Sequence, residues 1–166
     1  MLMKRLYKLM GLILLSVLMI REDKRRVMQL RQNDDFGSGG FGASRGGRPH
    51  LGADYIVSEG ETIYAPFDME VKRVSYPYEG DLSLKGIALY TKVDGVHYDG
   101  RIFYFTPDAN IIGRTITKGT RIGVAQTLQK KYPGITDHIH VQLRTTKEVP
   151  DSINYNGWYY INPENV

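Results

Sequence analysis

The sequence predicts an all-β fold, a compact antiparallel sandwich or barrel-like core with little helix. Short runs of β-branched and aromatic residues recur between residues 53 and 161. Turn signals separate these runs at intervals of about 8–12 residues, which is typical of sandwiches and barrels. Glycine (18 residues) and proline (7 residues) are frequent, and this favours a turn-rich β fold over a helical bundle.

The first half of the predicted domain consists of strands and hairpins. Residues 53–78 alternate β-forming residues with turn signals. Residues 86–107 contain two β-rich runs on either side of Asp94-Gly95, a pair that favours a two-residue hairpin turn. A second Asp-Gly pair at 99–100 predicts a further turn.

The second half continues the pattern of short strands. Residues 111–126 contain two glycine turns and a short strand, and residues 137–144 form the next β-prone run. Residues 127–133 are the one modest helix candidate. The aromatic tail, residues 152–166, is predicted to pack back on the sheet.

Two segments precede this domain, which we predict to span residues 48–166. Residues 1–21 read as a signal peptide or signal anchor, because a basic start precedes eleven apolar residues, 10–20. That run is shorter than the roughly 20 residues of a membrane span but fits a signal-peptide core. No small-residue cleavage signal follows, so an uncleaved anchor and a buried apolar helix remain open. Residues 22–47 are charged and then glycine-rich, which predicts a flexible linker.

Charge and cysteine content exclude several classes of function. The formal charge of +4 belongs to the N-terminal end, since residues 32–166 hold 14 Lys/Arg and 16 Asp/Glu, a net charge of −2. The domain therefore lacks the excess of positive charge that nucleic-acid binding requires, and we expect no nucleic-acid partner. The chain has no cysteine, which excludes thiolate metal sites, cysteine nucleophiles and disulfides.

Histidine spacing points to a metal site. His138 and His140 stand two apart in a β-prone run, so their side chains face the same way, about 6.7 Å apart along the strand. Upstream, Asp54 follows His50 by four residues, and an extended chain would separate the two by about 13 Å. One metal could hold both only if the chain bends between them, and Gly52 permits positive φ. Imidazoles with a carboxylate are typical of catalytic zinc sites.

These motifs resemble a known enzyme family. HxxxD, here "HLGAD", followed at a distance by HxH, here "HIH", is similar to the signature of the LytM/lysostaphin-type zinc metallopeptidases. "YAPFDMEVKRV" resembles the first hairpin of that fold, "ITKGTRIGVA" its VKxGxxIG turn, and "INPENV" its closing segment. The resemblance implies a LytM-type β core and a chemistry that cuts peptide cross-links of bacterial peptidoglycan.

A closer resemblance lies within the same fold. "RPHLGADYIVSEGETIYAPF", "IFYFTP" and "LQKKYPGITDHIHVQL" resemble the leukocyte cell-derived chemotaxin-2 family of secreted cytokines, over roughly residues 45–165. The resemblance implies a divergent relative, because that family carries disulfides that this chain cannot form. We therefore expect residues 48–166 to be a LytM/chemotaxin-like zinc-binding domain.

The resemblance also implies roles for individual residues. His50, Asp54 and His140 match the three zinc ligands, so the expected cofactor is Zn²⁺. His138 matches the catalytic base of the peptidases, and could act as that base or orient the metal-bound water. The peptidases have one further histidine, whose equivalent place here falls at Tyr104. A tyrosine there could donate a hydrogen bond to an oxyanion, but with a pKa near 10 it is a poor proton acceptor.

Two functions follow as expectations. The first is a secreted zinc-binding protein of the chemotaxin type, acting on protein receptors or microbial surfaces rather than by efficient catalysis. The second is a zinc metalloendopeptidase that cleaves bacterial cell-wall peptides. Either would be extracellular if the leader is cleaved, and anchored to a membrane only if the leader is retained.

Overall fold

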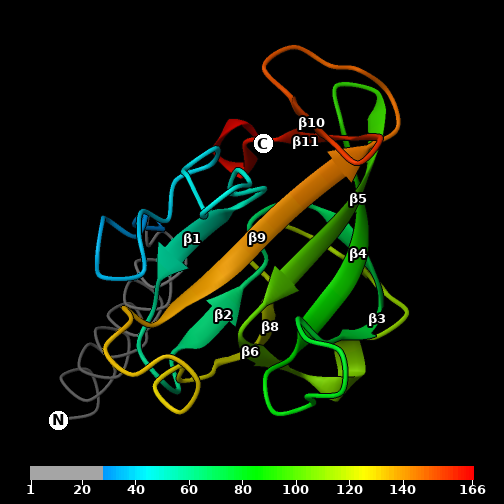
Figure 1. Ribbon diagram of the computed structural model, residues 1–166. Helices are drawn as coiled ribbons and strands as arrows, with labels where there is room; N and C mark the ends of the chain where they lie inside the picture. Colours follow the sequence, from blue (N-terminus) through cyan, green and yellow to red (C-terminus); the bar gives the residue numbers. More distant parts are fainter. Residues whose placement is uncertain (1–27) are drawn as a thin grey trace, which may run out of the picture.

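Two β-sheets form the core of the computed structural model, which describes residues 28–166 (Figure 1). The larger sheet has the strand order β10-β11-β9-β5-β4-β3-β7, with β1 paired to β9, and the smaller has the order β2-β8-β6. All pairings are antiparallel. The all-β prediction is therefore confirmed.

The strands are short and follow one another closely, as the turn spacing predicts. They are β1 Ala53–Ile56, β2 Thr62–Tyr64, β3 Met69–Ser75, β4 Gly86–Val93, β5 Val96–Phe103, β6 Phe105–Pro107, β7 Thr115–Ile116, β8 Arg121–Ala125, β9 His138–Thr145, β10 Ile153–Tyr155 and β11 Trp158–Ile161. Two 3₁₀ turns, η1 Ala109–Ile111 and η2 Pro163–Asn165, complete the secondary structure of the described residues. None of the helices in this part of the chain is long and apolar enough to cross a membrane, and the predicted leader, 1–21, lies outside it.

The core lies between the two sheets, and β9 shows how alternation builds it. Ile139, Val141 and Leu143 of β9 are almost completely buried and belong to the main apolar cluster. The residues between them therefore face the opposite side of the sheet. That outer side, which carries His138 and His140, is the side of the functional site.

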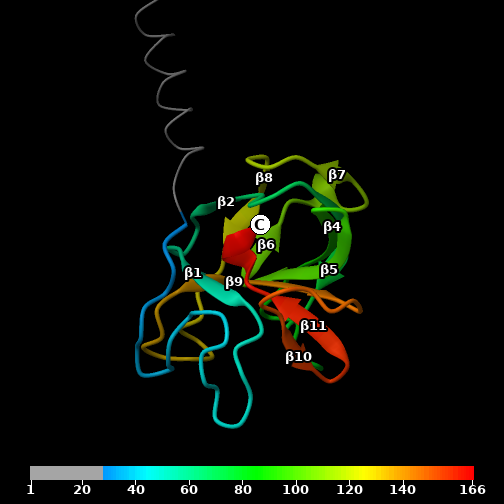
Figure 2. The same ribbon diagram turned by 90° about the horizontal axis from the view of Figure 1, so that it is seen from above.

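The predicted hairpin and the predicted tail are both present. Asp94 and Gly95 connect β4 to β5 with φ values of 47° and 81°, as a type I′ turn requires. The tail forms the β10–β11 hairpin, which pairs with β9. Figure 2 shows this hairpin beside β9.

Two local predictions are wrong. The pair at 99–100 is not a turn but lies inside β5. Gly100 leaves room there for two leucine side chains, since a Cβ would stand 2.5 Å from Leu89 and 2.7 Å from Leu143. The helix predicted over residues 127–133 is also absent. Its one helix-like hydrogen bond joins the Tyr132 amide to the Leu128 carbonyl, and the following proline and glycine end the turn.

The glycine-rich segment is in close contact with the domain, unlike the flexible linker that its composition predicts. We call residues 29–47 the N-terminal strap. Its first residues lie beside β1, where the Arg31 amide donates to the Asp54 carbonyl (2.8 Å) and the Asp54 amide donates to the Gly39 carbonyl (2.9 Å). Gly39 allows this approach, because a Cβ would stand 2.9 Å from the Asp54 Cβ. Residues 22–27 of the predicted linker lie outside the described residues.

Candidate metal centre

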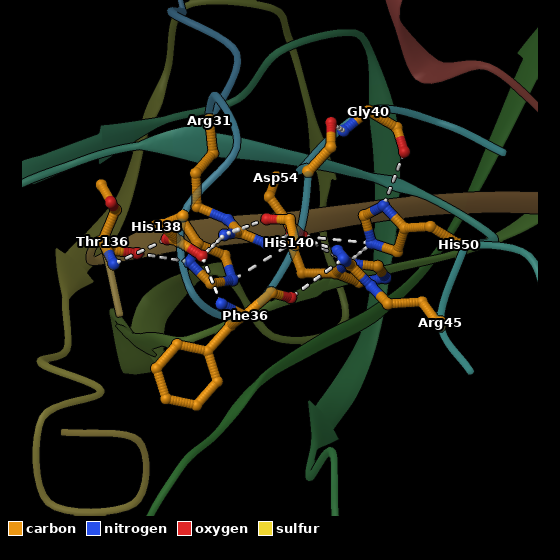
Figure 3. A network of polar contacts seen from close by, with 12 residues as sticks. Arg31, Phe36, Gly40, Arg45, His50, Asp54, Thr136, His138 and His140 are labelled. Carbon is orange, nitrogen blue, oxygen red and sulfur yellow. Dashed lines mark hydrogen bonds and ion pairs between the residues drawn. The ribbon is translucent and has the colours of Figure 1, made fainter. Parts of the chain in front are cut away.

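Pairing of β1 with β9 brings the predicted ligands together. Asp54 of β1 lies directly opposite His140 of β9, so their side chains share the outer face of the sheet. His138 lies two residues before His140 and faces the same way, as the spacing predicts. His50 lies between the strap and β1, and its imidazole points toward Asp54 and His140 (Figure 3).

Gly52 serves this arrangement in a different way from the one predicted. Its φ is not positive, so no left-handed bend connects His50 to Asp54. A Cβ at Gly52 would instead collide with the Val141 carbonyl and stand 2.7 Å from Cε1 of His140. The missing side chain therefore leaves room for the His140 ring.

Three donor atoms form a small triangle. The Asp54 Oδ1 lies 2.9 Å from the His140 Nδ1 and 3.3 Å from the His50 Nε2, and the two nitrogens are 3.1 Å apart. Zinc bonds of about 2.0–2.1 Å in tetrahedral geometry place neighbouring ligand atoms about 3.3 Å apart. Within residues 28–166, His50, Asp54 and His140 are the one group of His, Asp or Glu in which three ligand atoms all lie within 4.8 Å of one another. The donor set thus fits a small divalent cation.

Hydrogen bonds at the far side of the rings fix which nitrogens face the triangle. The His50 Nδ1 donates to the Gly40 carbonyl (2.9 Å), and the His138 Nδ1 donates to the Thr136 carbonyl (2.7 Å). A carbonyl only accepts, so in each neutral ring Nε2 carries a lone pair. Both lone pairs point toward the Asp54 Oδ1, itself an acceptor, at 3.3 and 3.7 Å. Acceptors facing one another in this way suit a bound cation, and such carbonyl partners commonly orient metal-binding histidines.

The centre is almost completely enclosed. The side chains of Asp54, His138 and His50 are 4%, 5% and 7% exposed, and that of His140 is 15% exposed. Burial lowers the pKa of His138 more than the nearby Asp54 raises it, so His138 is neutral at pH 7. Burial raises the pKa of Asp54, but the neighbouring imidazoles, His140 first among them, outweigh it and bring the pKa well below its usual range. A charged carboxylate therefore lies beside the neutral His138.

Two arginines of the strap hold the other oxygen of Asp54. The Asp54 Oδ2 accepts from the Arg31 Nη2 (3.0 Å) and from the Arg45 Nη2 (3.2 Å). Arg31 is 2% exposed, and a guanidinium buried to this extent needs such charged partners. One carboxylate oxygen is thus turned to the arginines and the other to the histidines. Sequence analysis missed both arginines, because their segment carries no strand or helix signal.

Asp34 links this network to β9. The Arg31 Nη1 lies 2.7 Å from the Asp34 Oδ1, and the Thr136 amide donates to the Asp34 Oδ2 (3.1 Å). Burial raises the pKa of Asp34, but hydrogen bonds from Arg31 and from the Thr136 and Phe36 amides outweigh it and lower the pKa to about 2. The ionised Asp34 thereby connects Arg31 to the residue whose carbonyl orients His138.

Tyr104 lies beside the centre, but its hydroxyl points elsewhere. Its ring meets the His138 ring edge-on, with centroids 5.3 Å apart. Its hydroxyl is hydrogen-bonded to the Tyr78 hydroxyl (3.0 Å), which in turn contacts the Tyr132 hydroxyl (2.8 Å). Burial raises the pKa of Tyr104, so the phenol keeps its proton. The backbone of Tyr104 has φ 73°, a strained value for a tyrosine, at the point where the chain passes from β5 to β6. The fourth histidine, His97, is exposed.

Comparison with known proteins agrees with these motifs. No family model matches the chain. Leukocyte cell-derived chemotaxin-2 from Mus musculus is 34% identical over 119 residues, covering 69% of this chain and 72% of the relative. The Bos taurus protein of the same name is 32% identical over 114 residues, with the same coverage. Myeloid protein 1 from Gallus gallus is 32% identical over 126 residues, which cover 69% of this chain and 34% of that relative.

Solved structures show a related fold. The solution structure of lysostaphin matches 78% of this chain with a TM-score of 0.51 and 18% identity. The match covers 51% of the lysostaphin chain, about half its length. At this identity the likeness concerns the fold alone, which is the lysostaphin-like β fold that the sequence motifs predict.

Replacement of Arg31 tests whether the strap supports the metal centre. In the Arg31→Met variant the Asp54 Oδ2 loses its buried partner, so the carboxylate can turn away from the histidines. Loss of such an orienting partner typically lowers metal affinity about 10- to 100-fold. We expect a decrease of that size for Zn²⁺, measured by competition with a chromophoric chelator.

Arg48→Met is the matched control, because Arg48 is exposed and should leave the affinity unchanged. Equal affinities of the wild type and Arg31→Met would show that Asp54 needs no support from the strap.

Proposed function

The chain belongs to the leukocyte cell-derived chemotaxin-2 family, and from this premise we propose that it is a secreted zinc-binding protein that acts on protein receptors or microbial surfaces rather than by efficient catalysis. His50, Asp54 and His140 hold the zinc ion in this proposal. Two imidazoles and a carboxylate are ligands that zinc accepts readily. A leader that stays uncleaved would instead anchor the protein to a membrane.

The observation that carries the proposal is the state of Tyr104. In the resembling peptidases this place belongs to a histidine that assists the reaction. The resemblance assigns that place to Tyr104, a half-buried phenol with a raised pKa whose hydroxyl is hydrogen-bonded to Tyr78. It cannot accept a proton at neutral pH, and the loss of one transition-state stabiliser typically costs about 10²–10³ in rate.

Burial of the ligands supports a structural role for the metal. The centre joins two parts of the chain that are far apart in the sequence, since His50 and Asp54 lie 90 and 86 residues before His140. A ligand that binds only the folded state stabilises it by about 2.7 kcal/mol at 100 times its dissociation constant. Zinc would in this way hold β1 and the residues just before it against β9 and preserve the surface that meets a partner.

A zinc endopeptidase is the second candidate, and His138 is the observation that favours it. Its Nδ1 is fixed by the Thr136 carbonyl, and its neutral Nε2 faces the centre, as a proton acceptor should. A bound zinc ion would supply an activated water and polarise a peptide carbonyl. His138 would then take up the proton, and Tyr104 would be limited to hydrogen-bond donation.

Metal removal tests the favoured function. The purified full-length chain is expected to contain one zinc ion, and a strong chelator should lower its melting temperature. The His140→Ala variant should contain no zinc and melt at one temperature with or without chelator. His97→Ala, which removes an exposed histidine, is the matched control and should behave as the wild type. A wild-type melting temperature that ignores both zinc and chelator would overturn the proposed site.

An assay on cell walls separates the two candidates. We expect zinc-loaded protein to release no more dye from labelled bacterial cell walls than the His140→Ala variant does, over one day. A lysostaphin-type enzyme serves as the positive control. Chelator-sensitive release by the wild type that His138→Gln abolishes would favour the peptidase and refute a binding function alone.

A further inference from the structure

The outer face of the large sheet continues away from the metal centre in regular rows. Strand register places Phe103 of β5 opposite His140, then Arg101 opposite Gln142, then Asp99 opposite Arg144. Successive rows on one face lie about 6.7 Å apart. The same register continues across β4 and β3, where Ala88 lies opposite Arg101 and Arg73 opposite Ala88. The first row beyond the metal centre therefore carries two arginines, and the second carries a third.

Arg73, Arg101 and Arg144, which we call the arginine patch, gather on this face without carboxylate partners. Within residues 28–166 none of the three forms an ion pair. Burial, together with the charges of Arg144 and Arg73, lowers the pKa of Arg101, and Asp99 opposes the shift only in part. Three like charges are thus held close together on one face. Its second row also carries two acids, Asp99 and Glu70, and Glu70 is paired with Lys72.

Packing of the arginine stems explains only part of this arrangement. Ala88 is 8% exposed although it does not belong to the core cluster, so neighbouring side chains of the outer face cover it. The Arg144 guanidinium stacks on Trp158, 3.9 Å from the ring centroid. Apolar stems and stacking account for the positions of the side chains. They do not account for the concentration of unpaired positive charge, which raises the free energy until an anion binds.

We propose that the arginine patch binds an acidic peptide segment of a partner protein, held in an extended conformation along β9 on the face that carries the metal centre. This inference rests on the proposed binding function and names the chemistry of the partner. Alternate side chains of an extended peptide are about 6.7 Å apart, which equals the spacing between the rows. Planar guanidinium groups also match the two oxygens of a carboxylate.

Charge on the rest of the domain favours a short acidic segment over a long polyanion. Residues 32–166 carry a net charge of −2, so a sulfated glycan that extends beyond the patch would meet net repulsion. β1, with the strap beside it, and the β10–β11 hairpin pair with the same edge of β9 near its two ends (Figure 2), and β5 pairs with the other edge.

Peptide binding tests the inference. Two fluorescein-labelled hexapeptides, with Asp or Asn at alternate positions between glycines, are titrated with the zinc-loaded full-length chain and followed by anisotropy. We expect the Asp peptide to bind at least tenfold more tightly than the Asn peptide, as charged hydrogen bonds would provide. Arg101→Gln should abolish this preference, and Arg101→Lys should keep only part of it because the forked geometry is lost.

Lys92→Gln is the matched control. Lys92 is an exposed cation of β4 outside the patch, so its loss changes net charge equally but should preserve the preference. The zinc content and the melting temperature of the Arg101→Gln variant show whether it folds as the wild type does. If either value changes, Arg144→Gln is used in its place to test the patch. Absence of a preference in wild-type protein that does contain zinc would refute this inference and leave the zinc proposal standing. An equal loss of the preference for the Asp peptide in Lys92→Gln and Arg101→Gln would also refute it. So would binding of a sulfated oligosaccharide that depends on Arg101, if the Asp peptide does not bind.

Discussion

One carboxylate, that of Asp54, is the constraint on which the site depends. It is buried and charged, so both of its oxygens must be satisfied within the protein. Oδ2 takes the charge of Arg31 and Arg45, while Oδ1 faces the histidines. This division explains why the strap lies against β1, since the strap supplies both cations. The three segments that meet at Asp54 cannot be separated without leaving a buried charge unpaired, which is costly.

The surroundings of the centre favour stability over turnover. Three hydroxyls of Tyr78, Tyr104 and Tyr132 bond one another beside His138, and the carbonyl of Thr136 fixes the ring of that histidine. A metal bound by His50, Asp54 and His140 would join β1 and the residues just before it to β9. Recognition would then fall to the exposed face, where β9 leads from the buried ligands to the arginine patch. In this view β9 serves the metal at one end and a partner along the rest of its length.

The sequence predicts the fold and the approach of the ligands because both depend on short-range patterns. Alternation along β9 places His138 and His140 on one face, and Asp94-Gly95 specifies a turn by its own backbone preference. The roles of two glycines differ from the predicted ones because they depend on residues far away in the chain. Gly100 leaves room for Leu143, and Gly52 leaves room for the His140 ring. The strap was predicted as a linker for the same reason. Its glycines resemble those of a flexible segment, and only the partner of Arg31, 23 residues on, shows why they are needed.

The measurement that tests the account most directly is the X-ray absorption spectrum of zinc bound to the full-length chain. The account predicts a first shell of nitrogen and oxygen at about 2.0–2.1 Å, with the outer-shell scattering of two imidazoles, and loss of half of that scattering or of all bound zinc in His50→Ala. A spectrum of hydrated zinc without imidazole scattering, or a protein that holds no zinc after reconstitution, would contradict the central claim that Asp54 and two histidines form a metal centre.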